Sequence, residues 1–394
     1  MTNETLISCH ICGSNAATII PEYPAFRRVT SDCKPWPAGG KLGVCGDCGC
    51  AQAMLDRAWH DEAKQIYDAY TIYHQSKGIE QSVFDQASGA AVSRSARLLQ
   101  RLRAEVPLPV SGRLMDIGCG NGALLRGFSD IARGWTLVGV EVNDHYRQIV
   151  EGIAGVEGLF TSSPEDVPGR FQMISLMHAL EHIPSPKGFI ARLRDKLDPG
   201  GLLLVQVPDC AENPFMFLVA DHASHFFVAT LRELVESSGY EVMVAANDWV
   251  AKELTVVARK PGGQRLTRPS QSPGDNVPGV TASLGWLRDQ MATVRSLARR
   301  GPLGIFGTSI AATWLFAELE GDVAFFVDED PHRSGQTCFG RPICRPVDVP
   351  AGSDVFIALP PFLAANIRER LERDGHHHRY HVPGALRPVE PAGA

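Results

Sequence analysis

The feature that most restricts the fold of this chain is the alternation of short apolar runs with amphipathic segments across its central third. Runs rich in Val, Ile, Leu, Met and Phe predict strands at residues 113–117, 135–140, 171–177 and 201–207. The stretches between them have helical spacing. Because neighbouring parallel strands need a crossover, which is usually a helix, this alternation predicts an α/β domain with a doubly wound, mostly parallel sheet.

A second and shorter alternation follows a segment rich in Pro, Gly and Ser. Residues 261–281 have the composition of a linker. Beyond them, residues 282–300 have helical spacing, and strands are predicted at 303–306, 323–327 and 354–359. The sequence therefore predicts a second α/β domain at the C-terminus.

Two cysteine pairs near the N-terminus predict a metal site. Cys9 and Cys12 form one Cys-x-x-Cys-Gly sequence, and Cys45 and Cys48 form another. The stretch between the pairs is too rich in Pro and Gly to build an apolar core, so a metal would replace that core. Four thiolates suit a tetrahedral Zn²⁺ with no open position, which predicts structural zinc. The alternatives are four free buried cysteines or redox pairs, although doubled pairs argue against the latter.

These features divide the chain into five predicted segments. They are a zinc-binding module at 1–60, a helical connector at 61–111, the central domain at 112–260, the linker at 261–281 and the C-terminal domain at 282–394.

Composition excludes several classes of protein. The 38 Lys and Arg against 44 Asp and Glu give a formal net charge of −6, which argues against a nucleic-acid partner, because a phosphate backbone requires a basic surface. No apolar run reaches the ~18 residues of a membrane span, and the first residues lack the basic and apolar regions of a signal peptide. We therefore expect a soluble, cytoplasmic protein without membrane association, whose ten cysteines do not form a disulfide framework.

A glycine-rich loop follows the first predicted strand of the central domain. In Asp116-Ile-Gly-Cys-Gly-Asn-Gly122, glycines at 118, 120 and 122 allow the backbone to approach a ligand closely. Glu141 ends the next predicted strand, where a carboxylate can bind both hydroxyls of a ribose. The glycine spacing differs from the G-x-G-x-x-G of dinucleotide-binding loops. No pyrophosphate need therefore be held here.

This Asp-x-Gly-x-Gly-x-Gly arrangement resembles motif I of class I S-adenosylmethionine-dependent methyltransferases. Residues 163–166, 176–184 and 197–202 resemble later stretches of the same superfamily. The resemblance implies a Rossmann-like core that binds S-adenosylmethionine, with the loop facing the methionine moiety, Glu141 on the ribose and Ser163 near the adenine. A Rossmann-type fold without this cofactor is the alternative. The cofactor-binding residues so implied are Asp116, Gly118, Gly120, Gly122, Glu141, Ser163 and His178.

The order of the domains resembles the sugar C-methyltransferases, which act on nucleotide-linked keto sugars. That family has an N-terminal zinc-binding domain, a methyltransferase core and a C-terminal Rossmann-like domain. Residues 304–307 and 326–346 resemble its C-terminal motifs, with several substitutions. The resemblance implies an enzyme that methylates a small molecule, a nucleotide-linked sugar.

The same family implies candidate catalytic residues. Its active site uses a Tyr from the segment after the zinc module, for which Tyr70 or Tyr73 is available, and a His after the fourth strand, which is His182 here. Its Tyr-His-Glu-His cluster corresponds to Val219-Ala-Asp-His222, which keeps only the final His.

His222 is the predicted general base, because imidazole titrates near neutral pH. Asp221 could orient that histidine, and His182 could bind a substrate oxygen. Interior or helix-capping histidines are the alternative interpretation. At the level of the whole chain, an O- or N-methyltransferase acting on another metabolite and a non-catalytic binding protein stay open. The sequence leaves the oligomeric state undetermined.

Overall fold

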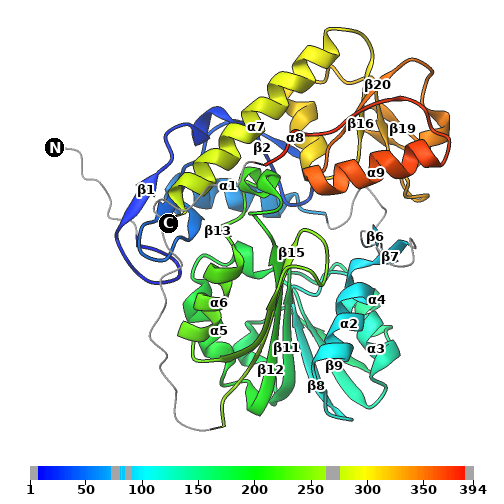
Figure 1. The fold of residues 1–394 in the computed structure, drawn as a ribbon. Helices are drawn as coiled ribbons and strands as arrows, with labels where there is room; N and C mark the ends of the chain where they lie inside the picture. Colours follow the sequence, from blue (N-terminus) through cyan, green and yellow to red (C-terminus); the bar gives the residue numbers. More distant parts are fainter. Residues whose placement is uncertain (1–7, 72–79, 81, 85–90, 263–275, 387–394) are drawn as a thin grey trace.

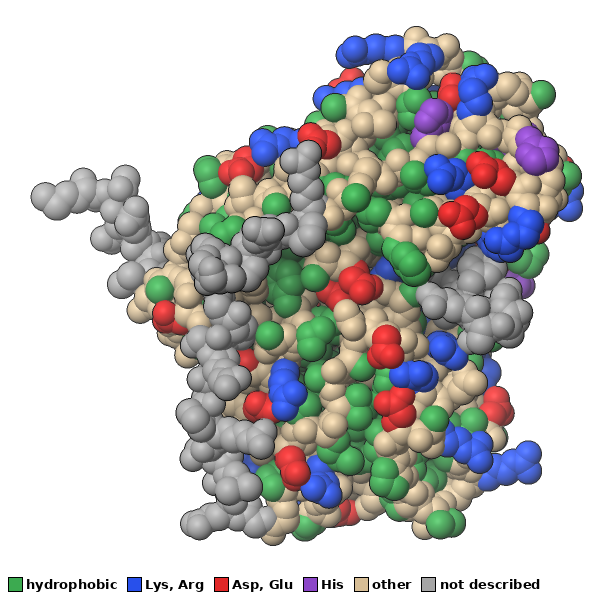
Figure 2. Space-filling model, in the orientation of Figure 1, with side chains coloured by type: hydrophobic (Ala, Val, Ile, Leu, Met, Phe, Trp, Pro, Cys, Tyr) green, Lys and Arg blue, Asp and Glu red, His purple; other side chains and the backbone are tan. Residues whose placement is uncertain are grey.

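The computed structural model describes residues 8–71, 80, 82–84, 91–262 and 276–386. In Figure 1 the central α/β unit (cyan to green) lies below an N-terminal module (blue) and a C-terminal α/β unit (yellow to red). On the face drawn in Figure 2, acidic and basic side chains are interspersed. None of the helices in these ranges is both long and apolar enough to cross a membrane.

The central unit contains a seven-stranded sheet of order β10-β9-β8-β11-β12-β15-β14, in which β15 is antiparallel to both of its neighbours. The predicted α/β core with a Rossmann-like sheet is therefore confirmed. The sequence patterns missed β10, β14 and β15, and they placed the start of β12 too late. The strands are β8 (Gly112–Ile117), β9 (Trp135–Val140), β10 (Val156–Phe160), β11 (Phe171–Met177), β12 (Leu197–Pro208), β14 (Glu241–Ala246) and β15 (Glu253–Arg259).

Helices cover both faces of this sheet (Figure 1). On one face, α2 packs against α3 through Leu98, Leu102 and Phe128, all of which are fully buried. On the other face, α5 packs against α6 through Ile190 and Leu234. The helices are α2 (Arg94–Glu105), α3 (Ala123–Ile131), α4 (Arg147–Glu151), α5 (Pro186–Leu193) and α6 (Val228–Ser237).

The sheet of the N-terminal module is completed by a strand from the central unit. Its order is β1-β4-β5-β13, and β13 consists of Ser224–His225, far along the chain from the other three strands. A separate hairpin joins β2 to β3 within the module. The module strands are β1 (Ala17–Ile19), β2 (Arg28–Val29), β3 (Pro35–Trp36), β4 (Leu42–Cys45) and β5 (Ala51–Ala53).

The segment predicted to be a helical connector contains strands as well as helices. Helix α1 (Arg57–Asp68) begins at Asp56, whose side chain accepts a hydrogen bond from the Trp59 amide at 3.0 Å. Before α2, the strands β6 (Ser82–Phe84) and β7 (Ala91–Ser93) pair as an antiparallel hairpin.

The C-terminal unit has a six-stranded sheet of order β18-β19-β17-β16-β20-β21. Its core continues into the N-terminal module, because the ring of Trp314 lies 6.5 Å from that of Phe26. The strands are β16 (Leu303–Phe306), β17 (Phe325–Val327), β18 (Thr337–Cys338), β19 (Arg341–Cys344), β20 (Asp354–Ile357) and β21 (Arg379–His381). The helices are α7 (Val277–Ala298), α8 (Ile310–Glu318) and α9 (Pro361–Arg373).

A buried ion pair fastens the β2–β3 hairpin to α1. Arg28 is 2 % exposed, and its guanidinium donates to both carboxylate oxygens of Glu62, at 2.8 and 2.7 Å. Its Nε donates to the carbonyl of Pro37 at 3.1 Å. A bidentate pair of this kind fixes direction as well as distance.

The substitution Glu62→Gln should destabilise the protein, because it leaves the buried Arg28 without its counter-charge. Loss of one partner of a buried pair costs about 3–5 kcal/mol, and the partial exposure of Glu62 places the expected loss near the lower end. Denaturant unfolding at neutral pH measures it. The control is Asp61→Asn, whose pair with Arg57 is exposed and should matter by less than about 0.5 kcal/mol. Equal stability of the two variants would contradict the prediction.

Candidate cofactor and acceptor site

A cavity of about 890 Å³ lies where the three units meet. The loops after β8, β9 and β11 form one part of its wall. The β2–β3 hairpin, the end of α1 and the segment after β12 form another part. The C-terminal unit contributes Ser309, Arg333 and Leu359. Its wall therefore contains residues from the whole length of the chain.

The predicted glycine loop lies in this wall with the backbone geometry that requires glycine. Gly118, Gly120 and Gly122 have φ values of +71°, +52° and +79°. A Cβ atom added at Gly118 would lie 2.9 Å from the Cβ of Ala179, and one added at Gly122 would lie 2.5 Å from a methyl group of Ile153. Positive φ values and close packing against the protein's own side chains therefore favour glycine at 118 and 122, and Gly118 and Gly120 bring the backbone of the loop to the cavity wall.

The two predicted acidic residues flank the loop. Asp116 is buried and accepts a hydrogen bond from the Ser175 hydroxyl at 2.7 Å, and burial raises the pKa of its carboxyl to about 7. Glu141 follows β9 and accepts from the amides of Gly120 (2.9 Å) and Val142 (2.7 Å). These contacts hold the Glu141 carboxylate at the cavity wall, where a ribose would bring its hydroxyls.

Two further predicted cofactor residues also line the cavity. Ser163 precedes the short helix η3 (Pro164–Asp166), and its hydroxyl donates to Glu165. His178 follows β11 with a strained φ of +50°.

Sequence reasoning missed the group that holds His178. The Arg94 guanidinium lies 2.7 Å from Nε2 of His178 and donates to Glu253 at 3.2 Å. Arg94 is the first residue of α2 and looks like a solvent-exposed helix position in the sequence. Only the approach of β15, which carries Glu253, makes it part of the site.

The candidate catalytic residues cluster on the acceptor side of the cavity. His182 ends the short helix η4 (Leu180–His182), and its Nδ1 lies 3.1 Å from the carbonyl and 3.4 Å from Oδ2 of Asp221. The ring of His222 stands edge-on to that of His182, with centroids 4.8 Å apart. Asp221 is thus the partner of His182, whereas the sequence analysis predicted that it would orient His222.

The two histidines have opposite charge preferences. Burial alone would lower the pKa of His182, but the hydrogen bond and charge of Asp221 outweigh it and raise the pKa to about 9. Burial and the neighbouring His182 charge lower the pKa of His222 well below its ordinary value. At neutral pH, His182 is therefore charged and His222 is neutral.

Of the two tyrosines that the sequence offered as catalytic candidates, the structure describes one. Tyr73 lies outside the described residues, and Tyr70 lines the cavity. Tyr67, which the sequence analysis did not consider, places its ring 6.2 Å from His182. Its place near the end of α1, one turn before Tyr70, was available from helical spacing.

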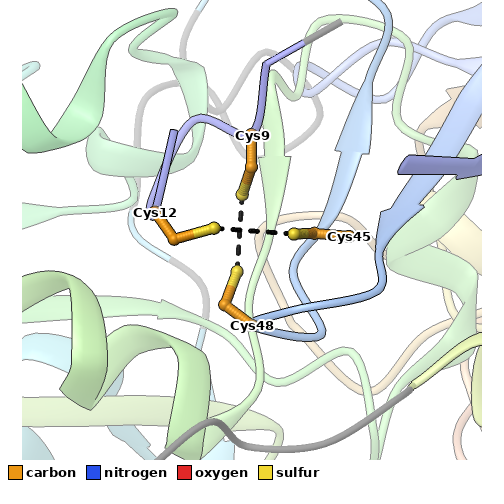
Figure 3. A group of neighbouring side chains, drawn as sticks. All are labelled: Cys9, Cys12, Cys45 and Cys48. Carbon is orange, nitrogen blue, oxygen red and sulfur yellow. Dashed lines mark hydrogen bonds between the residues drawn. The ribbon is translucent and has the colours of Figure 1, made fainter. Parts of the chain in front are cut away.

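The four N-terminal cysteines gather as predicted (Figure 3). The Sγ atoms of Cys9 and Cys48 are 3.4 Å apart, and those of Cys12 and Cys45 are 3.6 Å apart. A tetrahedron with Zn–S bonds of about 2.3 Å has edges of about 3.8 Å, so the geometry fits a metal ion of that size. Gly13 and Gly49, which follow the two pairs, have positive φ values, as the knuckle turns require.

The electrostatics of the thiols also favour a cation. A contact with Cys48 lowers the pKa of Cys9, and the same contact raises that of Cys48. A divalent ion at the centre would remove this conflict, because it keeps all four sulfurs as thiolates.

Glu181, His182 and His222 also bring ligand-type atoms within 4.8 Å of one another. Because His182 is already paired with Asp221, we interpret this group as acid–base residues.

Comparison with known proteins agrees with the geometry of the central unit. Residues 90–244 match the sequence family described as "Methyltransferase domain". The match covers less than half of the chain, and the central unit, in which most of it falls, is referred to as the methyltransferase domain. Ubiquinone biosynthesis O-methyltransferase of Pseudomonas aeruginosa (strain LESB58) is 25 % identical over 115 residues, which are 27 % of this chain and 49 % of that protein.

Trans-aconitate 2-methyltransferase of Variovorax paradoxus (strain S110) is 29 % identical over 123 residues, which are 30 % of this chain and 47 % of that protein. The chain thus spans about half the length of these curated relatives. Among solved structures, CalO1, a methyltransferase in calicheamicin biosynthesis in its SAH-bound form, aligns with a TM-score of 0.34 and 18 % identity, over 42 % of this chain and 53 % of that chain.

The substitution Cys9→Ser should empty the cysteine site. Zinc content, measured by mass spectrometry of the purified protein, should fall from about one ion per chain to a small fraction, and thermal stability should fall with it, since metal-binding free energy contributes to folding. Cys344→Ser, in the C-terminal unit, is the matched control and should keep the ion. Unchanged metal content in Cys9→Ser would contradict a zinc site here.

The substitution Glu141→Ala should weaken binding of S-adenosylmethionine by the methyltransferase domain. Charged hydrogen bonds contribute about 1.5–3 kcal/mol, so the dissociation constant should rise about 10- to 100-fold. Isothermal titration calorimetry measures this change. Asp144→Asn, an exposed change three residues away, should bind as the wild type does; equal affinity of Glu141→Ala and the wild type would remove Glu141 from the cofactor site.

Proposed function

We propose that this protein transfers a methyl group from S-adenosylmethionine to a small-molecule acceptor bound between its methyltransferase domain and its C-terminal unit, and that the acceptor is a nucleotide-linked sugar. One observation carries the proposal: the loop residues Gly118 to Asn121 and the ring of His182, which is paired with the buried Asp221, line the same cavity.

The residues on one side of the cavity fit the cofactor. The backbone of the glycine loop offers a surface without side chains, Glu141 offers carboxylate oxygens to a ribose, and Ser163 lies at the edge where an adenine would rest. Bound S-adenosylmethionine supplies a methyl group that its sulfonium already activates. The chain must therefore position the acceptor and manage its proton.

The two histidines divide these tasks in the proposed mechanism. The charged ring of His182, fixed by Asp221, donates a hydrogen bond to an acceptor oxygen and stabilises negative charge that develops there. The neutral ring of His222 has a lone pair and accepts the acceptor proton. Burial opposes a charge on His222, so this proton transfer depends on the acceptor being acidified by His182.

The opposite wall supports an acceptor that carries phosphate. Ser309 precedes α8, whose N-terminus presents backbone amides, and Arg333, which also pairs with Asp328 and Asp330, lies in the same wall. From the methyltransferase domain, Lys252 faces the cavity with a strained φ of +71°. A diphosphate between a sugar and a nucleoside matches this combination of cations and a helix end.

A specific observation favours transfer to oxygen as the second candidate. Val219 and Ala220 are buried apolar residues at the positions where the sugar C-methyltransferase cluster has Tyr and His. They leave fewer polar groups for an enolate. The relative from Pseudomonas aeruginosa is itself named an O-methyltransferase.

The test uses the full-length protein and methyl-labelled S-adenosylmethionine with a panel of nucleotide sugars and a panel of phenols and carboxylic acids. NMR of the product distinguishes C- from O-methylation. The substitution His222→Ala should keep cofactor affinity and lower turnover about 10²- to 10⁴-fold, the usual contribution of acid–base catalysis. His377→Ala, an exposed histidine of the C-terminal unit, is the control. Labelling of phenols or acids alone would reject the sugar substrate, and absence of cofactor binding would reject the whole proposal.

A further inference from the structure

The hairpin between β2 and β3 brings a residue of the N-terminal module to the candidate catalytic pair. The amide of Ser31 donates to Oδ1 of Asp221 at 2.9 Å, and its hydroxyl donates to Oδ2 at 2.5 Å. Asp221 is 0 % exposed. Both oxygens of this buried carboxylate are therefore held by one serine, and Oδ2 also faces His182.

We propose that Ser31 is a positioning residue for methyl transfer, which holds the carboxylate of Asp221 so that Asp221 holds the ring of His182 toward the acceptor. This inference rests on the function proposed above. Ser31 touches neither the cofactor loop nor His182 in the contacts described, so it acts through Asp221.

The geometry explains why His182 needs this support. Its Nδ1 edge is taken by the carbonyl and the carboxylate of Asp221. The Nε2 edge is then the part of the ring left for the acceptor. A carboxylate that turned about its own side chain would leave the ring held by the Asp221 carbonyl alone, without the neighbouring negative charge, and the two donors of Ser31 oppose that rotation.

The hairpin itself is firmly anchored. Arg28 pairs with Glu62 of α1, and Val29 bridges to Val219. The amide of Ala220 donates to the carbonyl of Val29 at 2.8 Å. Ser31 is therefore presented to Asp221 by a rigid element, which is what an orienting contact requires.

The groups that face His182 come from three elements, and a fourth element faces its partner Asp221. Glu181 lies on its own short helix, Asp221 and His222 on the segment after β12, and Tyr67 on α1, while Ser31 on the hairpin faces Asp221. If Asp221 loses its support, it opposes the effect of burial on the pKa of His182 less strongly, and only the charge of Glu181 still favours the protonated ring to the same extent. The pKa of His182 should then fall from about 9 toward its ordinary value.

The experiment compares the full-length wild type with Ser31→Ala and Ser31→Thr. Imidazole NMR gives the titration midpoint of His182, assigned from the spectrum of His182→Gln. Ser31→Ala should lower this midpoint by about one pH unit and lower kcat about 10- to 100-fold, with KM and cofactor affinity changed less than about twofold. Ser31→Thr, which keeps the hydroxyl, should restore most of both losses.

Two further variants make the result decisive. Ser129→Ala removes a serine hydroxyl bonded to the carbonyl of Ala154, away from the cavity, and should leave both readouts as in the wild type. If Ser31→Ala does not fold, Ser31→Cys removes the hydroxyl at similar size and gives the same readouts. A wild-type midpoint and kcat in Ser31→Ala, or in Ser31→Cys, would overturn the proposal. The titration needs no turnover. If Ser31→Ala lowers the midpoint of His182 but the wild type transfers no methyl group to any acceptor tested, the proposed function is rejected, while the role of Ser31 in positioning Asp221 and His182 stands.

Discussion

The pairing of Ser224 and His225 with Gln52 and Ala51 is the interaction on which the arrangement of the site depends. It makes two residues of the methyltransferase domain the edge strand of the N-terminal sheet. The same segment is tied at its other end by the bridge from Val29 to Val219, and in its middle by the amide of Ala223, which donates to the carbonyl of Glu181 at 2.8 Å. The residues between these ties, which include Asp221 and His222, therefore have little freedom. Fixing them costs conformational entropy once, during folding, and not again in each encounter with an acceptor.

This arrangement gives the cysteine cluster a role beyond its own module. Cys9, Cys45 and Cys48 pack in the same buried cluster as Phe226, directly after β13. A metal that held the two knuckles together would therefore also hold the sheet that pairs with β13, the strand that follows Asp221 and His222. The small module has little apolar core of its own: its buried residues pack against the C-terminal unit and the methyltransferase domain, and a bound metal would add to this packing. The physical link from Cys9 to His222 runs through sheet pairing and apolar contact.

The sequence predicted those parts that depend on local spacing. The strands 135–140 and 171–177 agree with β9 and β11, and the glycine loop with Glu141 occupies the predicted place beside the cavity. Local patterns missed β14, which is an edge strand with partly exposed side chains. They also missed β13, which is only two residues long and is a strand because it pairs with β5. They also missed Arg94, Tyr67 and Ser31. Tyr67 could have been found from its helical spacing to Tyr70. Arg94 and Ser31 belong to the site because each contacts a residue that is remote in the chain, and no local spacing encodes such a contact.

The same distinction applies to the charges of the site. A histidine in a sequence has an ordinary pKa near 6.5, and nothing in the residues 178–182 indicates that His182 and His222 would differ. Their difference arises because Asp221 faces one ring and not the other. A buried carboxylate is unfavourable unless its oxygens are paired. For Asp221, Ser31 of the N-terminal module donates to both oxygens, and the negative charge stabilised in this way faces His182 of the methyltransferase domain. The C-terminal unit lines another part of the cavity, so the wall of this candidate site is assembled from three units only in the folded chain.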